Sequence, residues 1–379
     1  MSNIPFNRPA LVGKEITYLR EAVRRGQLAG DGHFTHLCNQ KVVEFTGAKK
    51  ALLTHSCTAA LEMAAILCEL APGDEVVMPS YTFVSTANAV ALRGAVPVFV
   101  DIDPETLNID PALAADAITP RTKAIFAVHY AGFPADMDAL AEAGGPGCLL
   151  VEDAAQALGS TYKGRPAGSL GDLAAFSFHE TKNIISGEGG ALAINRDELC
   201  DRAEIIREKG TNRSLFFRGQ VDKYTWVDIG SSFLPGELIA SYLYAQLEMA
   251  EMINTRRVSI YDRYMEAFAE LEAAGRVRLP RTPAHCTGNG HMFYLIMDSL
   301  ADRSAFIAHM RAAGVTTPFH YVPLHSAPAG QRLARTAGSM MVTDRIAETL
   351  VRLPMFFDLG SEVEEVIDIA LAYFAREHG

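Results

Sequence analysis

Short apolar runs alternate with amphipathic or alanine-rich stretches between about residues 50 and 195. Apolar runs of about four to eight residues are typical of buried strands, whereas apolar spacings of three and four residues are typical of helices. The pattern predicts strands at residues 51–54, 75–78, 96–100, 123–128, 149–152, 174–178 and 191–194. It predicts helices between several of these strands, at residues 58–70, 84–93, 111–118 and 137–143. This alternation indicates an α/β fold, in which helices cover both faces of a largely parallel sheet.

A second pattern begins after Gly236, where apolar residues near helical spacing predict a long helix from residue 237 to 257 and onward. Beyond it, the sequence predicts helices at residues 304–313 and 362–374 and strands at residues 291–297 and 316–319. A chain of 379 residues is too long for one simple core. We therefore expect a large domain at residues 1–250 and a smaller C-terminal α/β domain at residues 251–379.

The composition narrows the possible functions. A net charge of -11 without a basic block argues against a nucleic-acid partner. The N-terminus lacks the apolar stretch of a signal peptide, and no apolar run approaches the ~18 residues of a membrane span. The six cysteines show no C-x-x-C spacing, so neither a metal site nor a disulfide framework is expected. These features together predict a cytoplasmic protein without a membrane partner.

Lys182 has surroundings that are unusual for a lysine, a residue that is almost always solvated. It lies between the predicted strand 174–178 and Gly187-Glu188-Gly189-Gly190, and Asp153 closes the apolar strand 149–152. Ligands of parallel sheets bind at the carboxyl ends of strands, where Asp153 falls. A buried lysine and acid suit pyridoxal 5′-phosphate (PLP), because the lysine can form a Schiff base and the carboxylate can keep the pyridine nitrogen protonated.

The junction Ser56-Cys57-Thr58, between a predicted strand and a predicted helix, has two interpretations. Unpaired N–H groups at a helix start bind phosphate, and Thr58 adds a hydroxyl; alternatively, Ser56 or Thr58 only caps the helix. The lysine and acid favour the phosphate interpretation.

Phe83 either stacks on a cofactor ring or packs in the core. Asp153 can also cap the following segment, and Gln156 can hydrogen-bond the ring hydroxyl oxygen.

Three further segments contain candidate substrate contacts. Residues 129–132 (His-Tyr-Ala-Gly) and 320–325 (His-Tyr-Val-Pro-Leu-His) either line a pocket or hold structural histidines. The basic segment 207–213 either meets a diphosphate through arginines or is a solvated helix end.

Together these segments resemble the sugar-nucleotide aminotransferases of the DegT family, which have the fold-type I architecture of PLP-dependent enzymes. The resemblance rests on Glu-Asp-Ala-Ala-Gln at 152–156, Ser-Phe-His at 177–179, Lys182 and Gly-Glu-Gly-Gly at 187–190, and it extends from residue 5 to residue 354. It implies that Lys182 is the catalytic residue that carries the Schiff base. Asp153 would hold the pyridine nitrogen, and Gln156 the ring oxygen.

The same resemblance implies a full set of site residues. The cofactor would be bound by Cys57, Thr58, Ala59, Phe83, Asp153, Gln156, Ser177, Lys182 and Ser232. The substrate would be contacted by His179, Arg213, His320, Tyr321 and His325. Members of the family are homodimers whose active sites lie at the subunit interface. Ser232 stands where many relatives use an asparagine from the partner subunit.

Residues 202–226 and the His-Tyr-Ala-Gly segment resemble a subgroup that aminates C4 of dTDP-4-keto-6-deoxy-D-glucose. The expected donor is L-glutamate, with pyridoxamine phosphate as the intermediate cofactor form and 2-oxoglutarate as co-product. Alternatives are another keto sugar nucleotide (UDP-linked or C3-keto), a PLP-dependent dehydratase, in which histidine would replace Lys182, and a non-catalytic PLP-binding regulator. The C4 configuration of the product stays open, and so does its destination, a cell-surface polysaccharide or a natural product.

Overall fold

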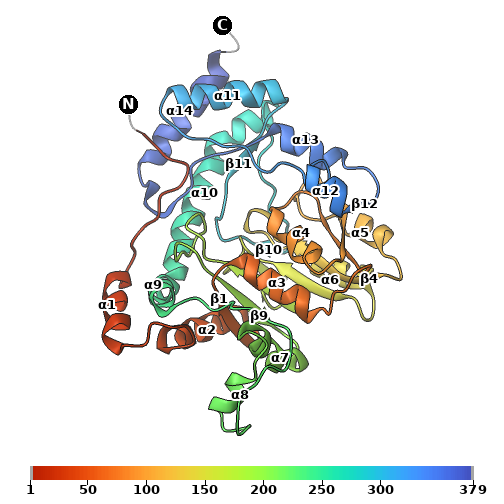
Figure 1. Cartoon of the computed structure of the whole chain (residues 1–379). Helices are drawn as coiled ribbons and strands as arrows, with labels where there is room; N and C mark the ends of the chain where they lie inside the picture. The colour runs from red at the N-terminus through yellow and green to blue at the C-terminus, as the bar shows by residue number, and fades with distance from the viewer. Residues whose placement is uncertain (1–2, 377–379) are drawn as a thin grey trace.

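The computed structural model describes residues 3–376, which are built around an eight-stranded sheet (Figure 1). The strand order is β1-β9-β8-β5-β4-β2-β3-β12. The strands are β1 (Lys50–Thr54), β2 (Glu75–Pro79), β3 (Val96–Val100), β4 (Thr122–Val128), β5 (Leu149–Asp153), β8 (Leu173–Ser177), β9 (Gly190–Ile194) and β12 (Arg335–Thr336). Neighbouring strands pair in parallel, except that β9 is antiparallel to both β1 and β8. The predicted α/β class with a mostly parallel sheet is confirmed.

Helices cover both faces of the sheet (Figure 1). They are α1 (Glu15–Arg25), α2 (His33–Thr46), α3 (Cys57–Leu67), α4 (Val84–Ala91), α5 (Pro111–Ala117), α6 (Met137–Gly144), α7 (Asp197–Arg207) and α9 (Glu237–Glu248). The short helix α8 (Arg213–Phe217) has no buried residue and projects away from the sheet (Figure 1). Successive strand residues face opposite layers: Leu52 packs in the cluster that includes α3 and α7, and Leu53 in the cluster that includes α2 and α9. Both faces of the strands are therefore buried.

Burial on both faces explains why the strands were predictable. Such strands are continuous apolar runs, and all five residues of β2 are buried. Each strand predicted between residues 51 and 194 is present, with its ends displaced by one residue at most.

Polar caps fix two helix starts: Ser56 accepts a hydrogen bond from the backbone of Ala59, and Asp110 accepts from the start of α5.

The C-terminal part forms a second layer of structure with its own apolar core, which includes Phe268, Phe293, Phe306 and Val366. Its elements are α10 (Ala250–Ala273), β11 (Tyr294–Ile296), α11 (Leu300–Ala312), α12 (Pro328–Leu333), α13 (Met341–Thr349), β13 (Leu350–Arg352) and α14 (Glu362–Arg376). β11 and β13 form a two-stranded sheet, and β6 (Thr161–Tyr162), β7 (Arg165–Pro166) and β10 (Cys286–Thr287) form a small three-stranded one. Short 3-10 helices span Tyr130–Gly132 and Phe357–Leu359.

Three details of this part differ from the sequence-based expectation. The predicted strand at 316–319 is wrong: only isolated bridges form at Val315 and Phe319, because Pro318 has no N–H to donate to a ladder. The predicted strand at 291–297 shortens to Tyr294–Ile296. The long helix breaks at Met249, whose backbone (φ -107°, ψ 8°) separates α9 from α10.

β12 comes from the C-terminal part of the chain and extends the main sheet beside β3. The two parts are therefore linked through the sheet as well as through α10, and the boundary near residue 250 stays a prediction. Between residues 3 and 376, no helix combines the length and the apolar character needed to cross a membrane.

Candidate active site

A cavity of about 610 Å³ opens at the carboxyl end of the sheet. It is bordered by the β1–α3 junction, the ends of β5 and β8, and the loop before β9. Segments near residues 291, 320 and 352 close the opposite side. Thr54, Gly190 and Ser177 are register partners across three strands, so distant segments meet here. A Cβ at Gly190 would lie 2.4 Å from the carbonyl carbon of Ser56, and only glycine permits this packing.

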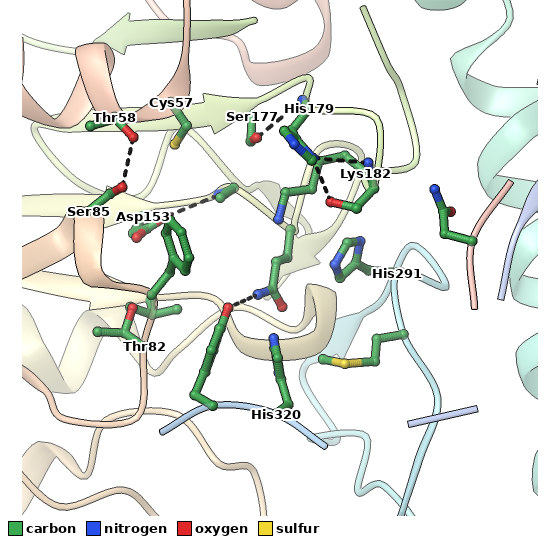
Figure 2. Close-up of a pocket in the computed structure, with 18 of the residues that line it drawn as sticks. Cys57, Thr58, Thr82, Ser85, Asp153, Ser177, His179, Lys182, His291 and His320 are labelled. Atoms are coloured by element: carbon green, nitrogen blue, oxygen red, sulfur yellow. Dashed lines mark hydrogen bonds between the residues drawn. The ribbon is translucent and has the colours of Figure 1, made fainter. Parts of the chain in front are cut away.

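Lys182 extends into the centre of this cavity (Figure 2). A tight turn holds it, in which its backbone N–H donates to the carbonyl of His179 and Phe178 donates to the carbonyl of Gly189, both at 2.9 Å. Burial lowers the pKa of Lys182, against smaller opposing effects of Cys57 and Asp153. A larger neutral fraction of the amine follows, and the neutral amine is the form that attacks an aldehyde.

Asp153 ends β5 and also faces the cavity (Figure 2). Its carboxylate accepts hydrogen bonds from Oγ1 of Thr86 at 2.8 Å and from the backbone of Ala155 at 3.3 Å. Burial raises the pKa of Asp153, and these two hydrogen bonds only partly oppose it. A cation beside Asp153 would restore the charged form, and a protonated pyridine nitrogen is such a cation.

Replacing Asp153 with asparagine should stabilise the cofactor-free protein at neutral pH, by about 2–4 °C in Tm. A carboxyl whose pKa is raised on folding lowers the free energy of unfolding above that pKa, and this penalty disappears below the pKa of the unfolded chain. Thermal unfolding of both cofactor-free forms tests this. A lower Tm for Asp153→Asn at neutral pH, or a difference that grows on acidification, would contradict it.

The start of α3 offers polar groups toward the cavity. Ser56 caps the helix by accepting from the Ala59 N–H at 3.1 Å, and this cap is compatible with a phosphate at the same helix start. Oγ1 of Thr58 lies 2.7 Å from Oγ of Ser85 (Figure 2). Cys57, Thr58 and Ser177 line the cavity, whereas Ala59 is buried behind it. A helix start with nearby hydroxyls remains suited to a phosphate, as proposed below.

Phe83 and Gln156 flank the cavity from two other loops. Phe83 lines the cavity and is 57% exposed, so the interpretation that it packs in the core is wrong for this chain alone. Oε1 of Gln156 accepts from the backbone of Ala131 at 2.7 Å, and its Nε2 donates to the hydroxyl of Tyr321 at 3.1 Å. One Nε2 hydrogen therefore remains for a cofactor or substrate oxygen.

His320 and Tyr321 form an aromatic wall of the cavity. Their rings stack with centroids 3.5 Å apart, and the hydroxyl of Tyr130 lies 3.0 Å from Nδ1 of His320. Tyr81 donates to the His320 carbonyl. Burial lowers the pKa of His320 and raises that of Tyr321, so both side chains stay neutral near pH 7. This wall can donate hydrogen bonds to a polyhydroxylated substrate without adding charge.

The other predicted substrate residues are divided between the cavity and the surface. His179 lines the cavity, with Nδ1 2.9 Å from Oγ1 of Thr181 (Figure 2). His325 does not line it, and instead contacts Ser80 (2.8 Å) and Asp344 (3.2 Å). Arg213 and Ser232 also lie outside the cavity and are exposed. Their roles stay predictions.

Three cavity residues were missed by the sequence reasoning: Arg257, His291 and Arg352. His291 lies on the cavity wall (Figure 2), and its Nδ1 is 3.0 Å from Oδ1 of Asn183, the residue after Lys182 in the chain. Arg257 donates to the carbonyls of Gly290 and His291 at 3.0 and 2.7 Å and so fixes this loop. The only available signal was the placement of Arg352 in the apolar segment Leu350-Val351-Arg352-Leu353.

The donor set fits PLP. A buried amine whose pKa is lowered, a buried carboxyl whose pKa is raised, and hydroxyls at a helix start match the aldehyde, the pyridine nitrogen and the phosphate in turn. No group of three or more His, Cys, Asp or Glu side chains within residues 3–376 could hold a metal ion.

Comparison with known proteins agrees with this geometry. The profile of the DegT/DnrJ/EryC1/StrS aminotransferase family matches residues 9–370. The chain belongs to this family. The aminotransferase TlmJ from Streptoalloteichus hindustanus is 34% identical, with a TM-score of 0.90 over 99% of this chain and 100% of that chain. The putative sugar aminotransferase Spr1654 from Streptococcus pneumoniae, in its PMP form, is 28% identical, with a TM-score of 0.91 over 99% and 100% of the two chains.

DesV from S. venezuelae is 31% identical, with a TM-score of 0.84 over 94% of this chain and 93% of that chain. The expectations of a fold-type I architecture, of PLP as cofactor and of a DegT-family aminotransferase are confirmed. The protein is a PLP-dependent sugar aminotransferase. What remains to be proposed is its particular substrate, its assembly and the role of each residue.

Proposed function

We propose that this enzyme transfers the amino group of L-glutamate to C4 of dTDP-4-keto-6-deoxy-D-glucose. The products are a dTDP-4-amino-4,6-dideoxy sugar and 2-oxoglutarate, as in dTDP-4-amino-4,6-dideoxygalactose transaminase. The observation that carries amino transfer is the buried pair of Lys182 and Asp153 in one cavity. The choice of C4 and of dTDP is supported by the resemblance of residues 202–226 to that subgroup.

In this proposal, PLP is held by the groups that line the cavity. Lys182 bonds to its aldehyde, Asp153 keeps the proton on its pyridine nitrogen, and Thr58, Ser177 and the start of α3 receive its phosphate. Phe83 packs on the ring. The bound cofactor supplies an electron sink for the carbon that carries the transferred amine.

Lys182 has a second task once glutamate displaces it from the cofactor. Its Nζ takes the proton from the α-carbon of glutamate and returns a proton to the sugar C4 when the steps run in reverse. Burial lowers the pKa of Lys182 and makes this amine a usable base near neutral pH. Tyr321 and His320 orient the sugar through neutral hydrogen-bonding groups, because burial disfavours their charged forms.

The substrate assignment is tested by comparing keto sugar nucleotides. With excess glutamate, kcat/KM for dTDP-4-keto-6-deoxyglucose should exceed that for the UDP-linked and the C3-keto analogues, and each turnover should release one 2-oxoglutarate. A higher value for either analogue would refute the choice of nucleotide or of carbon. Loss of the sugar oxygen without release of 2-oxoglutarate would instead indicate the dehydratase, which the presence of Lys182 disfavours.

The proposal includes a homodimer. The segment 213–229 projects from the body at α8 (Figure 1). It exposes large apolar side chains. Phe217 is 69% exposed and Trp226 is 77% exposed. Exposed apolar surface of this extent favours burial by a second chain. Arg213 and Ser232, which lie outside the cavity of their own chain, would then reach the partner's site.

We place this dimer in the cytoplasm, where its six free cysteines stay reduced.

Mixing two inactive variants tests this assembly. If Arg213 serves the partner's site, subunits carrying Lys182→Ala and subunits carrying Arg213→Ala should restore about a quarter of wild-type activity after random exchange in a two-fold dimer. Half of the dimers are then hybrids with one intact site. Activity of the mixture is measured against each variant alone. An unrestored mixture would place Arg213 in its own subunit's site, and a fully active Arg213→Ala enzyme would remove it from both.

A further inference from the structure

His291 is a cavity residue to which the proposed function gives no task. It lies on the loop before β11, and two sets of contacts hold it there. Arg257 donates to the backbone carbonyls of Gly290 and His291 at 3.0 and 2.7 Å. Nδ1 of the ring lies 3.0 Å from Oδ1 of Asn183. Both the main chain and the ring of His291 are therefore fixed at the cavity wall (Figure 2).

The hydrogen bonds of Asn183 fix the tautomer of this imidazole. Nδ2 of Asn183 donates to the backbone carbonyl of Asn289 and to Oδ1 of Asn254, both at 2.9 Å. A backbone carbonyl can only accept, so the NH₂ group must face it, and Oδ1 of Asn183 must face His291. Nδ1 of His291 is therefore the donor. Burial holds the pKa of His291 well below its ordinary value, so the ring is neutral and Nε2 keeps a free lone pair.

The lone pair of Nε2 lies in the same part of the cavity as the amine of Lys182. Within residues 3–376, no protein group forms a hydrogen bond with Nε2, and both side chains line the cavity (Figure 2). Asn183, which holds the ring, directly follows Lys182 in the chain. After burial, the charge of Lys182 is the next cause that lowers the pKa of His291, ahead of the two neighbouring arginines. His291 is thus a neutral acceptor beside the lysine.

We propose that His291 is a positioning residue, which accepts a hydrogen bond from Nζ of Lys182 once glutamate has displaced this lysine from the cofactor. The inference rests on the proposed function, because it concerns the base of the same reaction. A free amine rotates about the bonds of its side chain, and few orientations direct its lone pair at the α-carbon of the donor. When Nε2 holds one N–H of the amine, the lone pair is left free to face that carbon.

The proton transfer balances without a further reactant. The lone pair of Nζ takes the proton of the α-carbon, and the C–H electron pair is left with the donor and the bound cofactor. Nζ then carries three N–H groups and a positive charge. Its hydrogen bond to Nε2 becomes charge-assisted and therefore stronger, which favours the transfer. Burial and the charge of Lys182 lower the pKa of His291, so the proton stays on Nζ and can be returned to the sugar C4.

Two substitutions of His291 separate this role from a structural one. Asparagine keeps a donor near the position of Nδ1, and so the bond to Asn183, but has no acceptor at the position of Nε2. Glutamine reaches the position of Nε2 and keeps an acceptor there, but gives up the bond to Asn183. His285→Asn is the control for loss of a histidine, because His285 is exposed and lies outside the cavity.

The rate at which glutamate removes the absorbance of the lysine-linked cofactor is measured in a single turnover. It should fall about 10–100-fold in His291→Asn, less than about fivefold in His291→Gln, and not at all in His285→Asn. With α-deuterated glutamate, His291→Asn should show a primary isotope effect at least as large as that of wild type.

Two measurements do not depend on turnover. Calorimetry should show that His291→Asn binds α-methyl-L-glutamate, which has no α-proton, within about threefold of wild type. Nitrogen NMR of the cofactor-free protein should show the His291 hydrogen on Nδ1 near pH 7, with the assignment made by the loss of this signal in His291→Asn.

A His291→Gln enzyme as slow as His291→Asn, or slower, would overturn the inference, because the ring would then act only through its bond to Asn183. Wild-type rates in both variants would overturn it too. A slow His291→Asn enzyme without an isotope effect, or with affinity for α-methyl-L-glutamate lowered at least about tenfold, would place His291 on the donor instead of the lysine. A hydrogen on Nε2 would remove the acceptor. If wild type itself takes no amine from glutamate, the proposed function fails, and this result differs from all of the others.

Discussion

We expect the Lys182→Arg variant to turn over at least about 10⁴-fold more slowly than the wild-type enzyme. Arginine stays protonated, so it can neither bond to the cofactor aldehyde nor take a proton from the donor carbon. Both tasks need the neutral amine, and burial favours it by lowering the pKa of Lys182. The measurement is 2-oxoglutarate release at saturating glutamate and keto sugar, with circular dichroism to confirm that the variant is folded.

The chain offers a matched control for this substitution. Lys163 is a surface lysine that pairs with Asp138 at 2.9 Å, far from the cavity. Lys163→Arg should keep wild-type turnover, because arginine preserves the charge of an exposed ion pair. Residual turnover of Lys182→Arg above about 1% of wild type would refute the role assigned to this lysine as both anchor and base.

The second large effect concerns Asp153. Asp153→Asn should lower kcat about 10²–10³-fold, because the neutral amide no longer stabilises a protonated pyridine nitrogen. Glutamate affinity should change little, since Asp153 lies on the cofactor side of the cavity. Thr86→Val, which removes the 2.8 Å hydrogen bond to Asp153 together with the 2.9 Å contact to Oγ1 of Thr82, should lower kcat by about tenfold or less.

Steady-state kinetics of these variants gives the comparison, and Asp116→Asn on an exposed position of α5 is the control for charge loss. An Asp153→Asn enzyme with wild-type kcat would show that this carboxylate only caps the chain after β5. A Thr86→Val effect larger than that of Asp153→Asn would show that the threonine acts on its own. The expected change in stability has the opposite sign, because burial raises the pKa of Asp153 and the charged carboxylate therefore lowers the free energy of unfolding of the cofactor-free protein.

The strands of the main sheet could be predicted because each is buried on both faces, so local sequence alone marks it, as in β2. The structure of segment 316–319 was predicted wrongly, because its apolar content was given more weight than Pro318. No strand ladder forms there. The break at Met249 has no marker in the apolar spacing, which continues through it. Tertiary packing, rather than local pattern, decides where these C-terminal elements end.

The same distinction applies to the site. The positions of Lys182 and Asp153 at the carboxyl edge were predictable because Asp153 ends the buried strand β5 and Lys182 follows the buried strand β8. The place of His291 and Arg352 in the cavity was not predictable, since they reach it from segments whose position depends on the packing of the C-terminal part. The distinguishing property of Arg352 is that it has no acidic partner within residues 3–376 and that its buried Nε has no hydrogen-bond partner. Whether a side chain lacks an ion-pair partner depends on the fold and cannot be read from local sequence.

The most direct test of the account is a visible spectrum of the PLP-loaded enzyme through both half-reactions. L-Glutamate should remove the absorbance of the lysine-linked cofactor, and dTDP-4-keto-6-deoxyglucose, added after removal of glutamate, should restore it. Glutamate that leaves the absorbance unchanged would contradict amino transfer from this donor. Removal by glutamate without restoration by the sugar would contradict the proposed acceptor.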